Sequence, residues 1–225
     1  MNVDVLKQAP LFRGLDDEAA DALSSTMIEV PLRRGEVLFH EGDSGDRLYV
    51  VTDGKVKLGR RSADGRENLI AILGPGQMLG ELSLFDPGPR SATVTAVTDA
   101  TFLSLSHEDL LRWLDGRPAV ARGLLAQLAG RLRKANDVVA DLVFSDVPGR
   151  VAKALLDLAD RFGRTADDGV HVHHDLTQEE LAQLVGASRE TVNKALADFA
   201  SRGWLRLEPR SVVIMEVDRL RRRAR

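Results

Sequence analysis

The sequence predicts an α+β protein: an N-terminal jelly-roll β-barrel, a long helix and a C-terminal winged helix-turn-helix within 225 residues. Three observations predict it. Short β-rich runs separated by glycines occupy residues 27–105, heptad-spaced apolar residues occupy 119–143, and two short helical patterns joined by a glycine occupy 176–203. We expect a barrel domain over 1–116, a dimerisation helix and hinge over 117–145, and a third part over 146–225.

Composition excludes several classes of protein. The chain has no cysteine, which rules out disulfides, thiolate zinc sites and cysteine-ligated iron–sulfur clusters. Its first residues resemble no signal peptide, and no run reaches the about 18 apolar residues of a membrane span. We therefore expect a cytoplasmic protein with no membrane partner. Charge is slightly uneven: residues 1–145 carry 17 basic and 21 acidic side chains, whereas 146–225 carry 14 and 13.

Residues 27–105 contain seven short runs that favour β-strands. Many short strands at close spacing are typical of a sandwich or barrel. We expect hairpin turns at Asp53-Gly54 and Asp64-Gly65, since glycine tolerates positive φ. Two short helices are predicted before the first strand, within residues 4–24. The seven runs are MIEVPL, EVLFH, RLYVV, KVKLGR, ENLIAIL, SATVTAV and ATFLSL.

Two helices are predicted after the last strand. Ser106 begins the pattern S-H-E-D, which favours an N-cap and a helix over 107–115. A second helix over about 119–143 follows Pro118. Its apolar residues step by three and four, as in a coiled coil, which predicts either a dimer interface or packing on the chain's own barrel. They are Leu125, Leu128, Leu132, Ala135, Val139 and Leu142.

The segment S-D-V-P-G at 145–149 ends the long helix, and a helix over 149–162 is expected to stop at Gly163. A short strand, VHVHH, follows. Its histidines His171, His173 and His174 resemble a metal cluster, but solvated strand residues are the alternative that we favour, so no metal is predicted. Trp113 and Trp204 are expected to be core or interface anchors.

Residues 176–203 have the pattern of a DNA-binding helix-turn-helix. Thr177 and Glu180 form a capping box, which starts a helix at Gln178. Gly186 allows a tight turn, and Ser188 caps the second helix. On that helix one apolar face is expected to be buried, formed by Val192, Ala195, Leu196 and Phe199.

The opposite face of the second helix carries residue types that read base edges. Arg189 matches guanine and Glu190 matches cytosine, while Lys194 could reach a base or a phosphate. We predict that double-stranded DNA is the partner, with Gln178 holding a phosphate. The predicted DNA-binding set is Gln178, Ser188, Arg189, Glu190, Thr191, Asn193 and Lys194.

Two C-terminal features complete this part. Residues 204–215 alternate and turn at 208–211, which predicts a β-hairpin wing whose Arg210 could contact the DNA backbone. The last seven residues, RLRRRAR, contain five arginines. This run is either a phosphate-binding segment or a solvated tail, and we favour the tail.

A second candidate site lies at residues 80–91, GELSLFDPGPRS. Pro87, Gly88 and Pro89 form a stiff loop that presents Arg90, which can grip a phosphate. Residues 80–84 could form a helical turn whose free N–H groups attract an anion, and Glu81 could accept from a sugar hydroxyl. The pattern favours a nucleotide site, although an ordinary strand–turn–strand with a surface arginine remains the alternative.

The segments GELSLFDPGPRS and LTQEELAQLVGASRETVNKAL together resemble the cyclic AMP receptor protein family, the Crp/Fnr regulators, most closely its actinobacterial members. The order of barrel, long helix, hinge and winged helix matches as well. The resemblance implies cyclic AMP as an allosteric ligand. In ligand binding it assigns the ribose to Gly80 and Glu81, with Leu82 among the nearby backbone donors, and the cyclic phosphate to Arg90 and Ser91.

The resemblance also places Ala135 and Asn136 near the adenine, although Ala135 cannot hydrogen-bond. It implies a homodimer that acts as an activator or repressor on inverted repeats resembling TGTGA, with RNA polymerase as a partner. The family often has arginine where this chain has Lys194, which loses a bidentate contact. No nucleophile–base pair is present, so no catalytic residue or enzymatic activity is predicted.

Three alternatives remain. The same fold could bind DNA constitutively or respond to another effector. A jelly-roll metalloenzyme would need several histidine or carboxylate ligands, but only His40 and His107 precede residue 170. A pure interaction module built on the long helix would bind no DNA.

Overall fold

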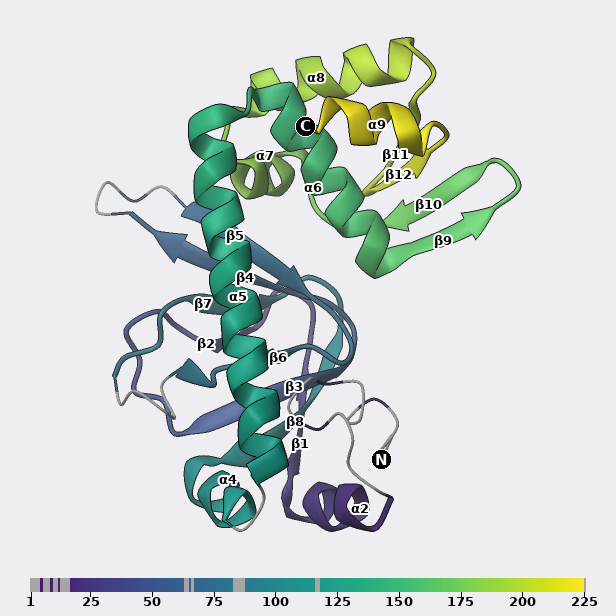
Figure 1. Cartoon of the computed structure of the whole chain (residues 1–225). Helices are drawn as coiled ribbons and strands as arrows, with labels where there is room; N and C mark the ends of the chain where they lie inside the picture. Colours follow the sequence, from purple (N-terminus) through teal and green to yellow (C-terminus); the bar gives the residue numbers. More distant parts are fainter. Residues whose placement is uncertain are drawn as a thin grey trace. The chain divides into compact units, whose positions relative to one another are not determined.

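A computed structural model describes residues 17–62, 65, 67–82, 88–115 and 118–224, together with Val5, Ala9 and Phe12. The chain forms two compact units, one of residues 1–60 and 70–133 and one of residues 61–69 and 134–225. Helix α5 (Pro118–Phe144) contributes to both (Figure 1). Of the two helices predicted near the N-terminus, the first lies outside the described residues, and the second is α2 (Asp17–Thr26).

The predicted barrel lies in the first unit, apart from its residues within 61–69. Eight strands form two four-stranded sheets, with the orders β1-β8-β3-β6 and β2-β7-β4-β5. This arrangement confirms the jelly-roll prediction. All seven predicted strands are present, and only β6 was missed, because two residues carry no alternating pattern. The strands are β1 (Ile28–Leu32), β2 (Val37–Phe39), β3 (Arg47–Asp53), β4 (Val56–Arg61), β5 (Glu67–Leu73), β6 (Met78–Leu79), β7 (Thr93–Ala96) and β8 (Ala100–Ser106).

The hairpin predicted at Asp53-Gly54 was wrong. Gly54 does have a positive φ of 78°. However, β3 pairs with β8 and β6, whereas β4 pairs with β7. The turn therefore carries the chain from one sheet to the other. A Cβ at Gly54 would stand 2.7 Å from the Cα of Ala100, so this crossing also needs glycine for space. Asp64, in the other predicted turn, lies outside the described residues.

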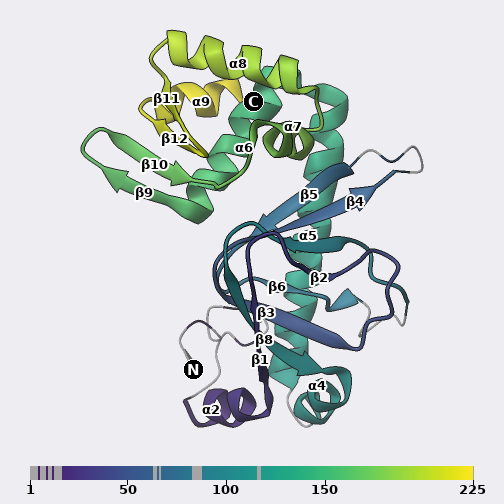
Figure 2. The same ribbon diagram turned by 180° about the vertical axis from the view of Figure 1, so that it is seen from behind.

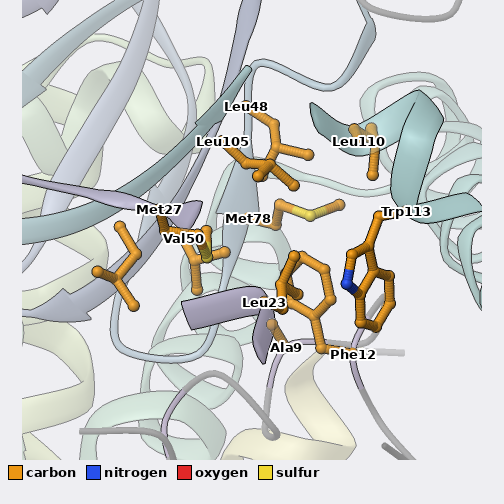
Figure 3. Packing of buried hydrophobic residues seen from close by; sticks show 11 residues of the cluster. Ala9, Phe12, Leu23, Met27, Leu48, Val50, Met78, Leu105, Leu110 and Trp113 are labelled. Atoms are coloured by element: carbon orange, nitrogen blue, oxygen red, sulfur yellow. The ribbon is translucent and has the colours of Figure 1, made fainter. Parts of the chain in front are cut away.

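The barrel core extends to the helices at one end of the sheets (Figure 3). The ring of Phe12 meets Trp113 edge-on, with centroids 6.3 Å apart, so Trp113 is a core anchor as predicted. Trp113 belongs to α4 (His107–Leu114), which Ser106 caps by accepting a hydrogen bond from the amide of Asp109 at 3.1 Å. The buried cluster contains Ala9, Phe12, Leu23, Met27, Leu48, Val50, Met78, Leu103, Leu105, Leu110 and Trp113.

Helix α5 covers the residues of the predicted long helix. Of its heptad-spaced apolar side chains, Leu128 packs against the barrel core. The side chains of Leu125, Leu132, Val139 and Leu142 are 54–66% exposed. A continuous exposed apolar stripe of this kind is typical of an interaction surface. Among the described helices, none combines the length and apolar content that a membrane span requires.

The second unit contains helices around a four-stranded sheet of order β11-β12-β10-β9 (Figure 2). The wing prediction is confirmed, since β11 and β12 pair with Glu208 opposite Ser211. Trp204 stacks on Phe199 with centroids 5.4 Å apart. The elements are α6 (Val147–Phe162), β9 (Gly163–Ala166), β10 (Gly169–His173), α7 (Gln178–Val185), α8 (Arg189–Ser201), β11 (Leu205–Glu208), β12 (Ser211–Ile214) and α9 (Val217–Arg223).

Three expectations for this unit need correction. Strand β9 was missed, and α6 begins two residues earlier than predicted because Asp146 caps it. The basic C-terminal run forms part of α9, whose Leu220 is buried, while Arg221 and Arg222 are exposed to solvent. His174 is buried rather than solvated, and its Nδ1 accepts the amide of Leu176 at 3.1 Å.

The stop of α6 at Gly163 is confirmed, but for another reason than a left-handed cap. Its φ is −73°, which any residue can adopt. A Cβ at Gly163 would stand 2.8 Å from Cγ1 of Val170 and would overlap the carbonyl of Ala159. Glycine is required here because β10 packs closely against the end of the helix.

The histidines on β10 show no metal cluster within the described part of the chain. Instead, Nε2 of His171 lies 2.6 Å from Oδ1 of Asp168, and Nη2 of Arg206 lies 2.9 Å from Oδ2 of the same carboxylate. These hydrogen bonds, that of His171 first, lower the pKa of Asp168 from 3.8 to about 2.

This pKa predicts how the cluster responds to acid. A carboxylate whose folded pKa lies below its unfolded value favours the fold above about pH 3.9, and the contribution is lost as the pH falls toward the folded pKa. We expect Arg206→Gln to raise the pKa of Asp168 toward its ordinary value, as read from the carboxyl carbon in an NMR pH titration. Arg202→Gln is the control, because Arg202 pairs with Asp198 instead. An unchanged Asp168 titration in Arg206→Gln would contradict this assignment.

Candidate functional site

Arg90 is fixed inside the barrel by backbone groups. Its amide donates to the carbonyl of Asp43 at 2.8 Å, and its carbonyl accepts the amide of Gly42 at 2.9 Å. Its side chain is directed inward and donates from Nη1 to the carbonyl of Gly80 and from Nη2 to that of Arg47, both at 2.9 Å. Arg90 is only 4% exposed, so the surface-arginine alternative is wrong.

The space around the guanidinium is shaped by two aromatic rings and two glycines. Cζ of Arg90 lies 4.3 Å from the ring centroid of Phe39 and 5.8 Å from that of Tyr49. A Cβ at Gly80, where φ is 79°, would stand 2.6 Å from Nη1, and a Cβ at Gly45 would overlap the guanidinium. Both glycines are therefore required for this placement of Arg90.

The buried guanidinium has unused hydrogen-bonding capacity. Burial lowers the pKa of Arg90, against the attraction of Tyr49 and the nearby carboxylates, yet arginine stays charged at neutral pH. Its Nε is buried and has no hydrogen-bond partner among the described residues. A buried donor without a partner is costly, and a charged one favours an anion. The arrangement therefore suits a bound phosphate.

Glu81 supplies the complementary group. It is 1% exposed, and its Oε1 accepts a hydrogen bond from Nη1 of Arg131. Its Oε2 is also buried and accepts no hydrogen bond from any described residue. Arg131 also donates to the carbonyl of Met78. The sequence analysis missed Arg131. The available signal was its position on α5, one helical turn before Ala135 and so on the same helix face.

The structure brings some of the predicted ligand residues together and leaves others exposed. Gly80, Glu81 and Arg90 are brought together in the first unit. The side chain of Leu82 is 51% exposed, and Ser91 is exposed. Ala135 and Asn136 are exposed on the part of α5 that belongs to the second unit. The predicted helical turn over 80–84 and the proline loop lie partly outside the described residues.

In the second unit, local caps define the two helices of the helix-turn-helix. Thr177 Oγ1 accepts the amide of Glu180 at 3.1 Å, while Oε2 of Glu180 accepts the amide of Thr177 at 2.8 Å, which is the predicted capping box. Gly186 ends α7 with a φ of 70°. Ser188 caps α8 by accepting the amide of Thr191 at 3.2 Å. These three predictions are confirmed.

Helix α8 has the predicted two faces. Val192, Ala195, Leu196 and Phe199 are buried, and the opposite face is open. Lys194 forms an ion pair with Glu190 at 2.7 Å, and both side chains are more than 70% exposed. Such an exposed pair is weak, so both groups can exchange it for contacts with a ligand. Gln178, Ser188, Arg189 and Thr191 are also exposed, and Asn193 is half-buried.

Arg150 joins the end of α5 to the turn of the helix-turn-helix, and the sequence analysis missed it. Its guanidinium donates to the carbonyls of Ser145 at 2.8 Å, Val185 at 3.1 Å and Gly186 at 3.3 Å. Carbonyls at helix C-termini lack partners within their own helix and carry partial negative charge. One cation therefore satisfies the ends of two helices. Leu142 lies next to the same turn, 3.4 Å from where a Cβ of Gly186 would be.

Comparisons with known proteins find a family match in each part of the chain. Residues 29–117 match the cyclic nucleotide-binding domain family, and residues 149–223 match the Crp-like helix-turn-helix domain family. A CRP-like cAMP-activated global transcriptional regulator of Mycobacterium tuberculosis is 54% identical over 222 residues, which cover 99% of each chain.

Two solved structures extend this likeness to the fold. The catabolite activator protein of Thermus thermophilus is 40% identical, with a TM-score of 0.56, over 96% of this chain and 98% of its own. FixK2 of Bradyrhizobium japonicum is 25% identical, with a TM-score of 0.78, over 87% and 96%. The M. tuberculosis relative is named as a transcriptional regulator and not as an enzyme. The chain is therefore a member of the Crp/Fnr family of transcriptional regulators.

Proposed function

We propose that this protein is a cyclic AMP-responsive transcriptional regulator that binds inverted-repeat operators as a homodimer. One observation carries the proposal. Among the described residues, a buried, charged arginine whose Nε has no partner lies in the same barrel as a buried glutamate whose Oε2 has none, in a chain that also has an exposed helix-turn-helix face. A cyclic nucleotide offers an anionic phosphate and a ribose hydroxyl, which are the two groups that these atoms lack.

In this proposal each pocket residue has a role. Arg90 and Ser91 bind the cyclic phosphate, and Glu81 accepts from the ribose 2′-hydroxyl, with Gly80 and Leu82 supplying backbone contacts. Ala135 and Asn136 of the second copy in the dimer face the base. Asn136 can both donate and accept hydrogen bonds, whereas Ala135 contributes only a methyl group. The relatives of M. tuberculosis and T. thermophilus that are named for cyclic AMP support adenine as that base.

DNA recognition is assigned to the exposed face of α8. Arg189 reads guanine through two donors, Glu190 accepts from cytosine, and Lys194 adds a single charged donor. Gln178, Ser188, Thr191 and Asn193 contact the DNA backbone or neighbouring bases. The half-site resembles TGTGA. Arg210 lies at the wing turn with a φ of 56° and is exposed, which suits a phosphate contact.

The exposed stripe on α5 forms the dimer interface. Pairing two such stripes covers the apolar side chains and presents two α8 helices to successive major grooves. We assign residues 1–116 to ligand binding, 117–145 to dimerisation and the hinge, and 146–225 to DNA binding. The protein acts in the cytoplasm, where bacterial DNA lies, and contacts RNA polymerase as an activator or repressor.

The two sites are coupled through α5 and the hinge. Cyclic AMP favours one packing of the paired helices, and the hinge at 144–149 then repositions the two α8 helices. The size of the effect cannot exceed the difference in cyclic AMP affinity between the two states.

The first prediction for this function concerns operator binding. We expect cyclic AMP to raise the affinity of the full chain for an inverted TGTGA-type repeat by about 10-fold or more, in the range of typical allosteric couplings. Fluorescence anisotropy at fixed salt measures it, because phosphate contacts make the affinity depend on salt. Equal operator affinity with and without cyclic AMP would contradict the proposed switch and favour constitutive DNA binding. A response to another nucleotide, but not to cyclic AMP, would mean that the other nucleotide is the ligand.

The second prediction concerns the space around Arg90. Gly45→Ala places a methyl group where the guanidinium lies, so we expect cyclic AMP affinity to fall by about 10- to 100-fold, the worth of one charged hydrogen bond. Arg90→Gln should give a loss of the same order. Isothermal titration calorimetry measures both.

Gly130→Ala is the matched control, because a Cβ there meets no atom closer than Nη2 of Arg133 at 3.9 Å. It should bind as the native chain does. If Gly45→Ala and Arg90→Gln are folded by circular dichroism yet bind cyclic AMP normally, Arg90 does not hold the phosphate.

A further inference from the structure

The C-terminal helix ends on the cap of α6. Nη2 of Arg223, the last residue of α9, donates to Oδ2 of Asp146 at 2.5 Å. The other oxygen of Asp146, Oδ1, accepts the amide of Gly149 at 2.9 Å and so caps α6. Asp146 therefore uses one oxygen to start α6 and the other to hold the end of α9. These hydrogen bonds, that of Arg223 first, keep the pKa of Asp146 below its ordinary value.

The surroundings are built for this contact. Leu220, one turn before Arg223, is fully buried and anchors α9. Gly149 is buried, and a Cβ there would stand 3.3 Å from the carbonyl oxygen of Arg223 and 3.4 Å from its Nη1. Glycine thus lets the end of α9 approach the first turn of α6. The negative end of α9 then faces the positive end of α6, which is a favourable arrangement of helix dipoles.

The contact between Arg223 and Asp146 lies at the link between α5 and α6. Only Ser145 and Asp146 separate the end of α5 from the start of α6. The carbonyl of Ser145 is held by Arg150, which also binds the carbonyls at the end of α7. Asp146 is held by Arg223. Both residues of the link are therefore fixed by arginines from elsewhere in the same unit.

We propose that Arg223 is a positioning residue that fixes the α5–α6 link, so that the C-terminal helix keeps the direction of the helix-turn-helix domain on α5 defined. If the link has one fixed conformation, a rearrangement of α5 moves α8 as well. If the link is flexible, α8 can keep its position while α5 rearranges. This inference assigns a role to the basic C-terminal run that differs from phosphate binding. It rests on the proposed function only in its second readout, the response of operator affinity to cyclic AMP.

The neighbouring arginines provide matched controls. Arg222 is exposed, and no ion pair or hydrogen bond joins it to another described residue. Arg222→Gln therefore removes the same charge from the same helix without touching Asp146. Arg223→Lys keeps the charge and should rescue much of the contact. Asp146→Ser keeps a capping oxygen for Gly149 but removes the partner of Arg223.

The first readout needs neither ligand nor DNA. Hydrogen–deuterium exchange in the full-length protein reports opening at the amides of Gly149 and Arg150. We expect Arg223→Gln and Asp146→Ser to speed this exchange by about two- to fivefold, the range that an exposed ion pair supports. Arg222→Gln should leave it unchanged. Combining Arg223→Gln with Asp146→Ser should add little, because both changes remove one interaction.

The second readout is the ratio of operator affinity with cyclic AMP to that without it. We expect Arg223→Gln to lower this ratio by about two- to fivefold, while calorimetric affinity for cyclic AMP stays native. Arg223→Lys should restore most of the ratio, and Arg222→Gln should not change it. A merely structural contact would alter stability or exchange without changing the ratio.

The outcomes separate the two proposals. If Arg223→Gln matches Arg222→Gln in exchange and in the ratio, the positioning role is wrong and the proposed function stands. Faster exchange with an unchanged ratio would also overturn it, leaving a purely structural contact. If the operator affinity of the native protein does not respond to cyclic AMP, the proposed function fails. The role of Arg223 at the link is then tested by hydrogen–deuterium exchange alone. Unchanged exchange in Arg223→Gln would show that Arg223 does not fix the link.

Discussion

The candidate ligand site of the first unit is built around one charged guanidinium held inside a β-barrel. Removing a cation from water is costly unless its hydrogen bonds are replaced. For Arg90, hydrogen bonds to two backbone carbonyls and the contact with the ring of Phe39 offset part of this free energy. Because Gly45 and Gly80 have no side chains, there is space for the guanidinium. The Nε remains unpartnered among the described groups, and so does one oxygen of Glu81. A site that keeps a buried donor and a buried acceptor unfilled is organised for a ligand rather than for maximal stability.

Helix α5 connects this site to the rest of the chain. In the first unit Arg131 of α5 contacts Glu81, and in the second unit the same helix ends at a two-residue link held by Arg150 and Arg223. Each of these contacts is made by an arginine whose planar guanidinium can serve several acceptors at once. In the proposed mechanism, a change in the Glu81 contact acts on α5, whose other end is linked to the helix-turn-helix. Coupling of this kind needs two states of the helix, and the exposed apolar stripe, paired with a second copy, can supply them.

The sequence predicted the features that local chemistry decides. The capping box of Thr177, the left-handed Gly186 and the cap at Ser188 define α7 and α8 within a few residues of chain, and the alternating runs define seven strands. It failed where partners are distant in sequence. Asp53-Gly54 has the composition of a hairpin, but strand pairing elsewhere makes it a crossing between sheets. Arg131, Arg150 and Arg223 act on groups between 5 and 77 residues away, and no local pattern indicates their partners.

The side-chain Nε–Hε resonance of Arg90 tests the central claim most directly. In a two-dimensional 1H–15N spectrum of the full-length protein, Arg90→Gln identifies this signal by its loss. A phosphate oxygen that accepts from Nε shifts the proton downfield. The account predicts a saturable downfield shift and slower exchange of this proton when cyclic AMP is added. If cyclic AMP binds, as calorimetry would show, while the Arg90 signal neither moves nor becomes protected, the ligand lies elsewhere and the pocket described above is not its site.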